Sequence, residues 1–177
     1  MTGPQAGASD AELIEFAAKG RMTVFPANQA LLRLGDMEQL YELRQRDTRF
    51  ELSRQQRSAP PLLLVSSTSL DVVRRYLLRS LGVTVRAELR LPRVTLPFDP
   101  AALPDGFAIA DARDTDTDAN GIELTWTEHG EAITARFRPG SAGERDAVQF
   151  AGYADASERA IIESLLAPSG RPLFATA

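Results

Sequence analysis

The strongest hydrophobic pattern in the chain lies in the segment SSTSLDVVRRYLLRSLG, residues 66–82. Its apolar residues recur every three or four positions, which is the spacing of one face of an α-helix. Three arginines, Arg74, Arg75 and Arg79, fall on the opposite side. The pattern predicts one amphipathic helix that lies across the face of a sheet. Its apolar stripe consists of Leu70, Val73, Leu77 and Leu81, widened by Val72 and Tyr76.

Both ends of this helix carry local signals. Thr68 or Ser69 can cap the N-terminus by accepting a backbone N–H, and Asp71 occupies the first turn, where the helix dipole favours an anion. Gly82 is placed as a C′ residue that can take a positive φ. The preceding apolar run, Leu62–Val65, is short enough to be a buried strand.

Two further helices are predicted near the ends of the chain. Ser9, followed by Glu12 three residues later, has the pattern of a capping box, and the helix that it begins ends at Gly20. The segment Ser157–Leu166 carries an apolar stripe and predicts a closing helix. Residues 1–8 are small and polar, and we expect them to be loose.

Elsewhere the apolar residues alternate with polar ones, which indicates strands. Three alternating runs between Asn28 and Arg54 are separated by short polar turns and predict an antiparallel meander covered on one face. Val83 and Val85 also alternate and predict a strand directly after Gly82. Five more strands are expected at Met22–Phe25, Gly106–Ala110, the hairpin Gly121–Thr127 with Glu131–Phe137, and Ala147–Phe150.

Loops complete the prediction. Four prolines in 92–106 indicate an extended internal connection. We expect Asp111–Asn120 to be an acidic loop, Gly140–Gly143 to be a short flexible loop, and His129 to lie in the exposed hairpin turn. The predicted fold class is α+β: one domain over residues 1–177, with a mostly antiparallel sheet, a central amphipathic helix, and N- and C-terminal helices.

Composition and charge narrow the function classes. The 177 residues include no cysteine, no apolar run long enough to cross a bilayer, and no signal-peptide pattern at the N-terminus, so we expect a cytoplasmic protein. Up to Phe98 there are 14 basic and 10 acidic residues, and beyond it there are 6 basic and 14 acidic. The acidic second half argues against nucleic acid as the main partner and is compatible with a basic protein partner.

The sequence does not single out a catalytic, metal or cofactor site. A calcium loop that starts at Asp114 would need glycine and glutamate where Ala119 and Thr125 stand, so the acidic run fails that pattern. With His129 as the only histidine, zinc ligation and a serine–histidine triad are disfavoured. Glycine-rich phosphate loops are missing. A pair of carboxylates brought together by the fold stays open.

Six segments between about Leu13 and Phe174 stand in a recognisable order: LIEFAAKGRMTV, RFELSRQQR, SLDVVRRYLLRSLG, RAELRLPRV, LPDGFAIAD and ESLLAPSGRPLF. In this order they resemble the TNT-antitoxin family, the immunity proteins that protect against tuberculosis-necrotizing-toxin-like NAD glycohydrolases. None of these is a catalytic motif, and their order and spacing carry more weight than any one of them.

The resemblance implies a non-enzymatic cytoplasmic inhibitor that binds a cognate secreted NAD-glycohydrolase toxin one to one and blocks the pocket where NAD enters. It transfers no inhibitory residue by motif. Charge and expected exposure suggest two partner-binding loops, with neither nucleic acid nor membrane as a partner. One is the acidic loop with Asp111, Arg113, Asp114, Asp116 and Asp118, and the other is the loop Arg54–Ser58 with Arg54 and Arg57.

Two other classes stay open at this point. A secretion-system chaperone would bind an exported protein without inhibiting any activity, and an enzyme would use a carboxylate site that the sequence does not reveal. Catalysis by the pure protein would favour the enzyme, and binding that leaves the partner's activity intact would favour the chaperone.

Overall fold

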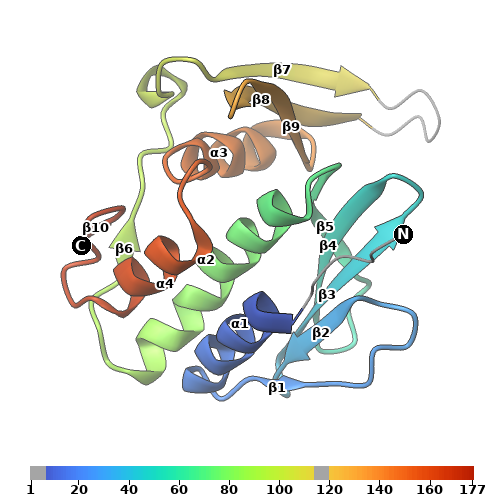
Figure 1. The fold of residues 1–177 in the computed structure, drawn as a ribbon, viewed down its shortest axis with the longest axis vertical. Coiled ribbons are helices and arrows are strands. Elements are labelled where there is room, and N and C mark those ends of the chain that lie inside the picture. The colour runs from blue at the N-terminus through green and yellow to red at the C-terminus, as the bar shows by residue number, and fades with distance from the viewer. Residues whose placement is uncertain (1–6, 114–119) are drawn as a thin grey trace.

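The centre of the protein is one antiparallel sheet of eight strands, seen in a computed structural model that describes residues 7–113 and 120–177 (Figure 1). The strands alternate in direction throughout, and helices pack against the sheet, which confirms the predicted α+β class. In spatial order the strands are β1 (Thr23–Val24), β2 (Leu32–Gly35), β3 (Gln39–Arg46), β4 (Arg49–Gln56), β5 (Leu62–Ser67), β9 (Glu131–Phe137), β8 (Asn120–Glu128) and β7 (Ala108–Arg113).

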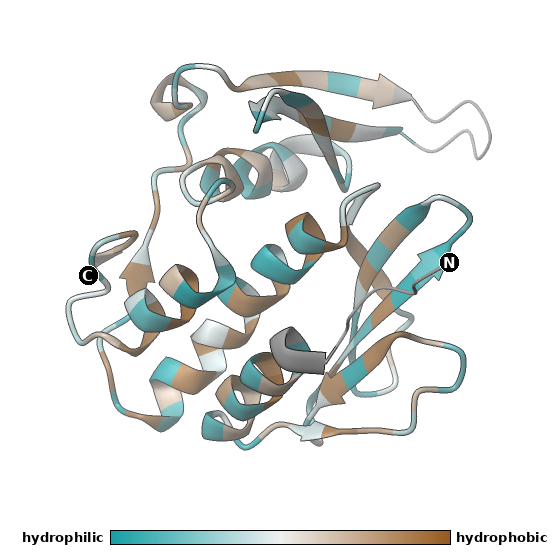
Figure 2. Ribbon diagram, in the orientation of Figure 1, coloured by the Kyte–Doolittle hydropathy of each residue, from teal (hydrophilic) through white to brown (hydrophobic). Residues whose placement is uncertain are grey.

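Strands β2, β3 and β4 form the predicted three-stranded meander, and β1 and β5 extend it on either side. Tyr41, Leu43 and Leu52 are buried on its inner face, and Leu43 pairs directly with Leu52 across β3 and β4. Figure 2 shows the same alternation as brown and teal bands along the strands beside the helices. A register shift between Leu52 and Ser53 lets β5 turn both Leu64 and Val65 inward.

The later hairpin joins the meander at a short seam. Strand β9 pairs with β5 through Val65 and Phe137, Ser66 and Arg136, and Ser67 and Ala135. The predicted hairpin of β8 and β9 is confirmed, and its turn places His129 at φ 52° and Gly130 at φ 84°. Both residues therefore adopt the left-handed conformation that a two-residue hairpin turn requires.

The described residues form four α-helices: α1 (Gly7–Lys19), α2 (Leu70–Glu88), α3 (Gly140–Ala151) and α4 (Glu158–Leu166). Helices α1, α2 and α3 contact the sheet, and α4 packs on α2. In Figure 1, α2 runs diagonally through the middle, between the meander and the part that contains α3 and α4. Helix α1 packs beside α2, and α3 packs under β8 and β9. The predicted central and terminal helices are thus confirmed, and Ser157 caps α4 by accepting from the Ala160 N–H at 3.2 Å.

Helix α2 is longer than predicted. It continues through Gly82 to Glu88, so Val83 and Val85 lie in the helix and not in a strand. The reason is tertiary packing: a Cβ on Gly82 would lie 2.7 Å from Cδ1 and Cδ2 of Leu165 on α4. Glycine here allows two helices to approach closely instead of ending one. At the other end Ser69 is the N-cap residue, but its side chain makes no capping bond.

Two of the three arginines placed on the polar side of α2 are buried. Arg74 forms ion pairs with Asp10 of α1 and with Glu158 of α4, where the Nε to Oε1 distance is 2.7 Å. Arg75 binds Glu128 at the end of β8, with 2.8 Å between Nη2 and Oε1. These partners are distant in sequence. Through them the polar side of α2 is joined to α1, α4 and β8.

Three other local predictions are wrong. The segment Ala147–Phe150 lies in α3, and Gly140–Gly143 is the first turn of that helix. Both Ala147 and Phe150 are buried, and their spacing fits a helix face as well as a short strand. Helix α1 begins at Gly7, so Ser9 lies inside it and not at its N-cap.

The proline-rich connection 92–106 is extended, as predicted. It contains the short strand β6 (Val94–Thr95) and one turn of 3-10 helix at Pro100–Ala102. Strand β6 pairs with β10 (Ala175–Thr176) in a separate two-stranded sheet. Among the described residues, none of the helices has the length and apolar character needed to span a membrane.

Candidate functional site

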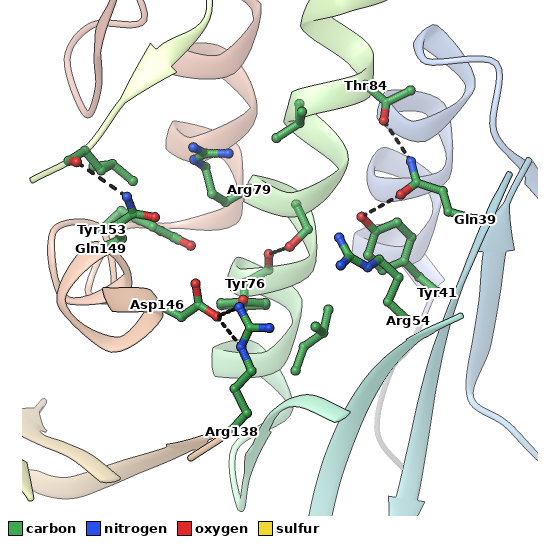
Figure 3. Close-up of a pocket in the computed structure, with 14 residues that line it drawn as sticks. Gln39, Tyr41, Arg54, Tyr76, Arg79, Thr84, Arg138, Asp146, Gln149 and Tyr153 are labelled. Atoms are coloured by element: carbon green, nitrogen blue, oxygen red, sulfur yellow. Dashed lines mark hydrogen bonds and ion pairs between the residues drawn. The ribbon is translucent and has the colours of Figure 1, made fainter. Parts of the chain in front are cut away.

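A polar pocket of about 330 Å³ lies inside the protein, between α2, the meander and α3 (Figure 3). Helix α2 contributes residues at positions 76, 79, 80, 83 and 84, which share one face of a helix. The opposite wall comes from β3 and β4, and α3 with the residues around it supplies the third wall. The pocket therefore exists because this face of α2 is only loosely covered.

Charged side chains from three elements meet in this pocket. Arg54 lies in β4 and Arg79 in α2, and Arg138 is the residue that follows β9. Asp146 of α3 accepts from Arg138, with Oδ2 lying 3.0 Å from Nη2 and 3.2 Å from Nε. Figure 3 shows this pair beside Tyr76, with Arg54 and Arg79 on either side of the same space.

Arg54 and Arg79 have no ion-pair partner in the part of the chain that the structure describes. The Nε–H of Arg79 is buried and donates to no acceptor among the described residues. Its guanidinium lies 5.9 Å from the ring centre of Phe174, close enough for a cation–π contact. The pocket therefore holds positive charge that its own walls do not neutralise.

Apart from the three arginines and Asp146, the polar side chains that line the pocket are uncharged. Burial raises the pKa of Tyr41, Tyr76 and Tyr153, so their hydroxyls stay protonated at physiological pH. Burial also raises the pKa of Asp146, against the lowering effect of Arg138. Gln39 ties the meander to α2 by donating to the Thr84 hydroxyl at 3.0 Å.

A second hollow of about 620 Å³ lies on the outer face of the sheet; we call it the outer groove. Leu62 and Leu63 line it and are 40% and 44% exposed. Charged residues surround this apolar centre, and arginine outnumbers glutamate among them. They are Glu42, Arg44, Arg46, Arg49, Glu51, Arg136 and Arg138.

Ion pairs within the sheet neutralise part of this rim. Glu42 binds Arg33, with 2.9 Å between Oε2 and Nε, and also contacts Arg44. Arg46 lies 3.6 Å from Glu51, measured from Nε to Oε2. The outer groove thus combines an exposed apolar centre with a charged rim, which is the composition of many protein interfaces.

The structure separates the two arginines of the predicted loop Arg54–Ser58. Arg54 lies in strand β4 and faces the interior pocket, so its placement in a loop is wrong. Arg57 does lie in the turn after β4, at φ 49°, and its exposed side chain pairs with Glu38 at 2.6 Å, Nε to Oε2. The turns β2–β3 and β4–β5 therefore meet at one end of the sheet.

The predicted acidic loop is partly a strand. Asp111 and Arg113 belong to β7, and Asp114, Asp116 and Asp118 lie outside the described residues. Asp111 is exposed and borders a small hollow with Asn120 and Pro139. Because Asn120 and Pro139 also line the outer groove, this acidic end of β7 adjoins it.

Little in the amino-acid sequence predicts the interior pocket. Arg79 was placed on a polar helix side, and Arg138 and Asp146 lie on either side of a segment predicted to be a loop. The one available signal was the three-residue spacing of Tyr76 and Arg79, which puts an aromatic ring and a cation on the same face of the helix. No described group of three histidine, cysteine or acidic side chains could hold a metal ion.

Comparisons with known proteins agree on one family. The family model of Immunity protein 61 matches residues 16–173. "Immunity factor for TNT" of Mycobacterium tuberculosis and "Immunity factor for TNT homolog" of Mycobacterium bovis are each 31% identical over 115 residues. That stretch covers 62% of this chain and 57% of each relative, so little more than half of the relatives' length is matched.

A solved structure, Rv3902c from M. tuberculosis, has the same fold. It superposes with a TM-score of 0.77 over 93% of this chain and 92% of the other, at 21% sequence identity.

Proposed function

Because the chain belongs to the Immunity protein 61 family, we propose that it is the antitoxin of a cognate toxin that hydrolyses NAD. The family match over residues 16–173 carries the proposal. The names of the two curated relatives support the choice of toxin class. In this proposal the protein is a cytoplasmic inhibitor without catalytic activity of its own, and it forms a one-to-one complex that keeps NAD out of the toxin's pocket.

The outer groove is the surface that we propose for toxin docking. Its exposed Leu62 and Leu63 can be buried by a partner, while the arginine-rich rim selects for an acidic partner surface. The exposed Asp111 adjoins one end of the outer groove, and we propose that it and the acidic residues that follow it in sequence meet a basic patch on the toxin. Arg57 and its turn are the second proposed contact.

The test uses the protein encoded by the neighbouring gene as the candidate toxin. NAD hydrolysis by the purified toxin domain is followed while this protein is added, and we expect complete loss of activity near equimolar protein. A complex that leaves hydrolysis unchanged would favour a chaperone instead. NAD hydrolysis or another activity of this protein alone would favour an enzyme. Undiminished hydrolysis with no complex on a sizing column would contradict the proposal.

Leu63→Glu is expected to weaken toxin binding by about tenfold or more, because a central interface contact is typically worth more than 1 kcal/mol. Leu89→Glu is the matched control, since Leu89 is also 44% exposed but does not line the outer groove. The dissociation constants can be compared by biolayer interferometry. Equal affinities for both variants would place the interface elsewhere on the protein.

A further inference from the structure

We propose that the interior pocket is a binding site for a small molecule with a phosphate group. The feature that carries this inference is the meeting of Arg54, Arg79 and Arg138 around one space that contains a single carboxylate. The site lies on the inner side of the sheet and shares only Arg138 with the outer groove among the described residues. Its occupancy does not depend on the proposed toxin binding.

The charge balance of the pocket favours an anion. The only carboxylate that lines it, Asp146, is already engaged by Arg138. Arg54 and Arg79 approach from opposite walls and have no carboxylate partner in the described part of the chain. Guanidinium groups held in a partly enclosed space attract phosphate strongly, because their fork of donors matches its oxygens.

The hydrogen-bonding groups favour an acceptor-rich ligand. The hydroxyls of Tyr76 and Tyr153 are protonated donors, because burial raises the pKa of both. The Nε of Arg79 is a buried donor that no described residue satisfies. A buried unpaired donor costs free energy, so a ligand oxygen placed beside Arg79 would remove that cost. A phosphate group offers several such oxygens, and as a monoester dianion it carries no competing donor.

The size and openness of the pocket allow a ligand to enter. Its volume of about 330 Å³ lies at the lower end of the range for small-molecule sites. Val83, which lines it, is 58% exposed, so the pocket reaches the surface beside α2. The rings of Tyr41 and Tyr76 form part of the wall, and they can contact an organic group attached to the phosphate.

The experiment is isothermal titration calorimetry on the whole protein in Tris chloride buffer, without toxin. The probes are inorganic phosphate, AMP as a phosphate ester on a ring, and adenosine as the same ring without phosphate. We expect one-site binding of phosphate or AMP and no binding of adenosine. Tighter binding of AMP than of phosphate would identify a phosphate ester as the ligand, and the reverse order would identify the free ion.

Variants of the wall make the test specific. Arg79→Met and Arg54→Met should each weaken binding by about tenfold, because each removes a charge-assisted hydrogen bond. Asp146→Asn should strengthen binding, because it removes the only negative charge in the pocket. Arg93→Met is the control, since Arg93 is exposed, does not line the pocket, and changes the net charge by the same amount. Circular dichroism shows which variants are folded.

Three outcomes would overturn the proposal. The first is no heat of binding for phosphate and AMP at millimolar concentrations. The second is adenosine binding as tightly as AMP, which would show that the phosphate is not recognised. The third is equal loss of affinity in Arg93→Met and the two pocket variants, which would show that only the net charge matters. Arg54 and Arg79 lie on different elements. If one of the two variants fails to fold, the other can still be used to test the proposal.

Discussion

Arg86→Met is expected to lower the free energy of unfolding by about 3 kcal/mol, because it leaves buried carbonyl groups without a donor. Arg86 is only 2% exposed and comes from the last turns of α2. Its Nη1 donates to the carbonyls of Leu165 and Ala167, both at 2.7 Å, and Nη2 donates to that of Pro168 at 3.0 Å. Nε donates to the carbonyl of Pro92 at 2.7 Å.

These bonds satisfy carbonyls at the C-terminus of α4, where a helix has unpaired acceptors and a partial negative charge. One guanidinium thus ties α2, the end of α4 and the start of the proline-rich connection together. Since small domains are stable by only about 5–15 kcal/mol, the loss should be obvious in a urea titration.

The control for this prediction is Arg90→Met. Arg90 lies four residues later and is exposed, so its loss should change stability by less than about 0.5 kcal/mol. Arg86→Lys should recover part of the loss, because an ammonium group can donate to some of the same carbonyls. If Arg86→Met and Arg90→Met have the same urea midpoint, the carbonyls at the end of α4 do not depend on Arg86.

Gly143→Ala is expected to destabilise the protein by about 2–3 kcal/mol, as overpacking in a rigid region does. A Cβ at this position would lie 1.7 Å from the carbonyl oxygen of Arg138, so the backbone between β9 and α3 would have to move. This junction also holds Arg138 against Asp146. Thermal unfolding followed by circular dichroism measures the change.

Gly152→Ala is the matched control for Gly143→Ala. Gly152 ends α3 with φ −66°, and a Cβ there would meet its nearest atom, the carbonyl oxygen of Gln149, at 3.5 Å. Alanine fits this backbone, so the substitution should be neutral or stabilise by up to about 1 kcal/mol. A melting temperature for Gly143→Ala equal to that of Gly152→Ala would mean that the junction adjusts without strain.

The parts of the fold that the sequence predicts are those with local causes. Strand β3 begins and ends at Gln39 and Arg46 as predicted, because its alternation and the turns around it are both local signals. The hairpin β8–β9 follows from two alternating runs joined at His129 and Gly130. Helix α4 is also predicted from local signals, because Ser157 caps its N-terminus.

The errors come from contacts between residues far apart in sequence. Gly82 is in the helix because Leu165 packs against it, and nothing within a few residues of Gly82 indicates that. Arg74 and Arg75 are buried because Glu158 and Glu128 neutralise them. A helical wheel can assign a residue to a side, but it cannot say which other element lies on that side.

The candidate sites were predicted less well for the same reason. Arg57 is exposed in a turn as expected, but Arg54 faces inward because its place in strand β4 puts it beside Tyr41. The interior pocket needs α2, β4 and α3 to be placed first. Its cationic character could only be seen after Arg79 and Arg138 were brought together.

The seam between β5 and β9 also determines when the protein can finish folding during synthesis. The meander up to Ser67 can form as soon as it leaves the ribosome, but its neighbour in the sheet, β9, is made much later. Until then β5 is an edge strand with unpaired backbone groups, which other chains can join. A premature stop codon before Glu131 would therefore release a fragment whose unpaired β5 edge favours aggregation.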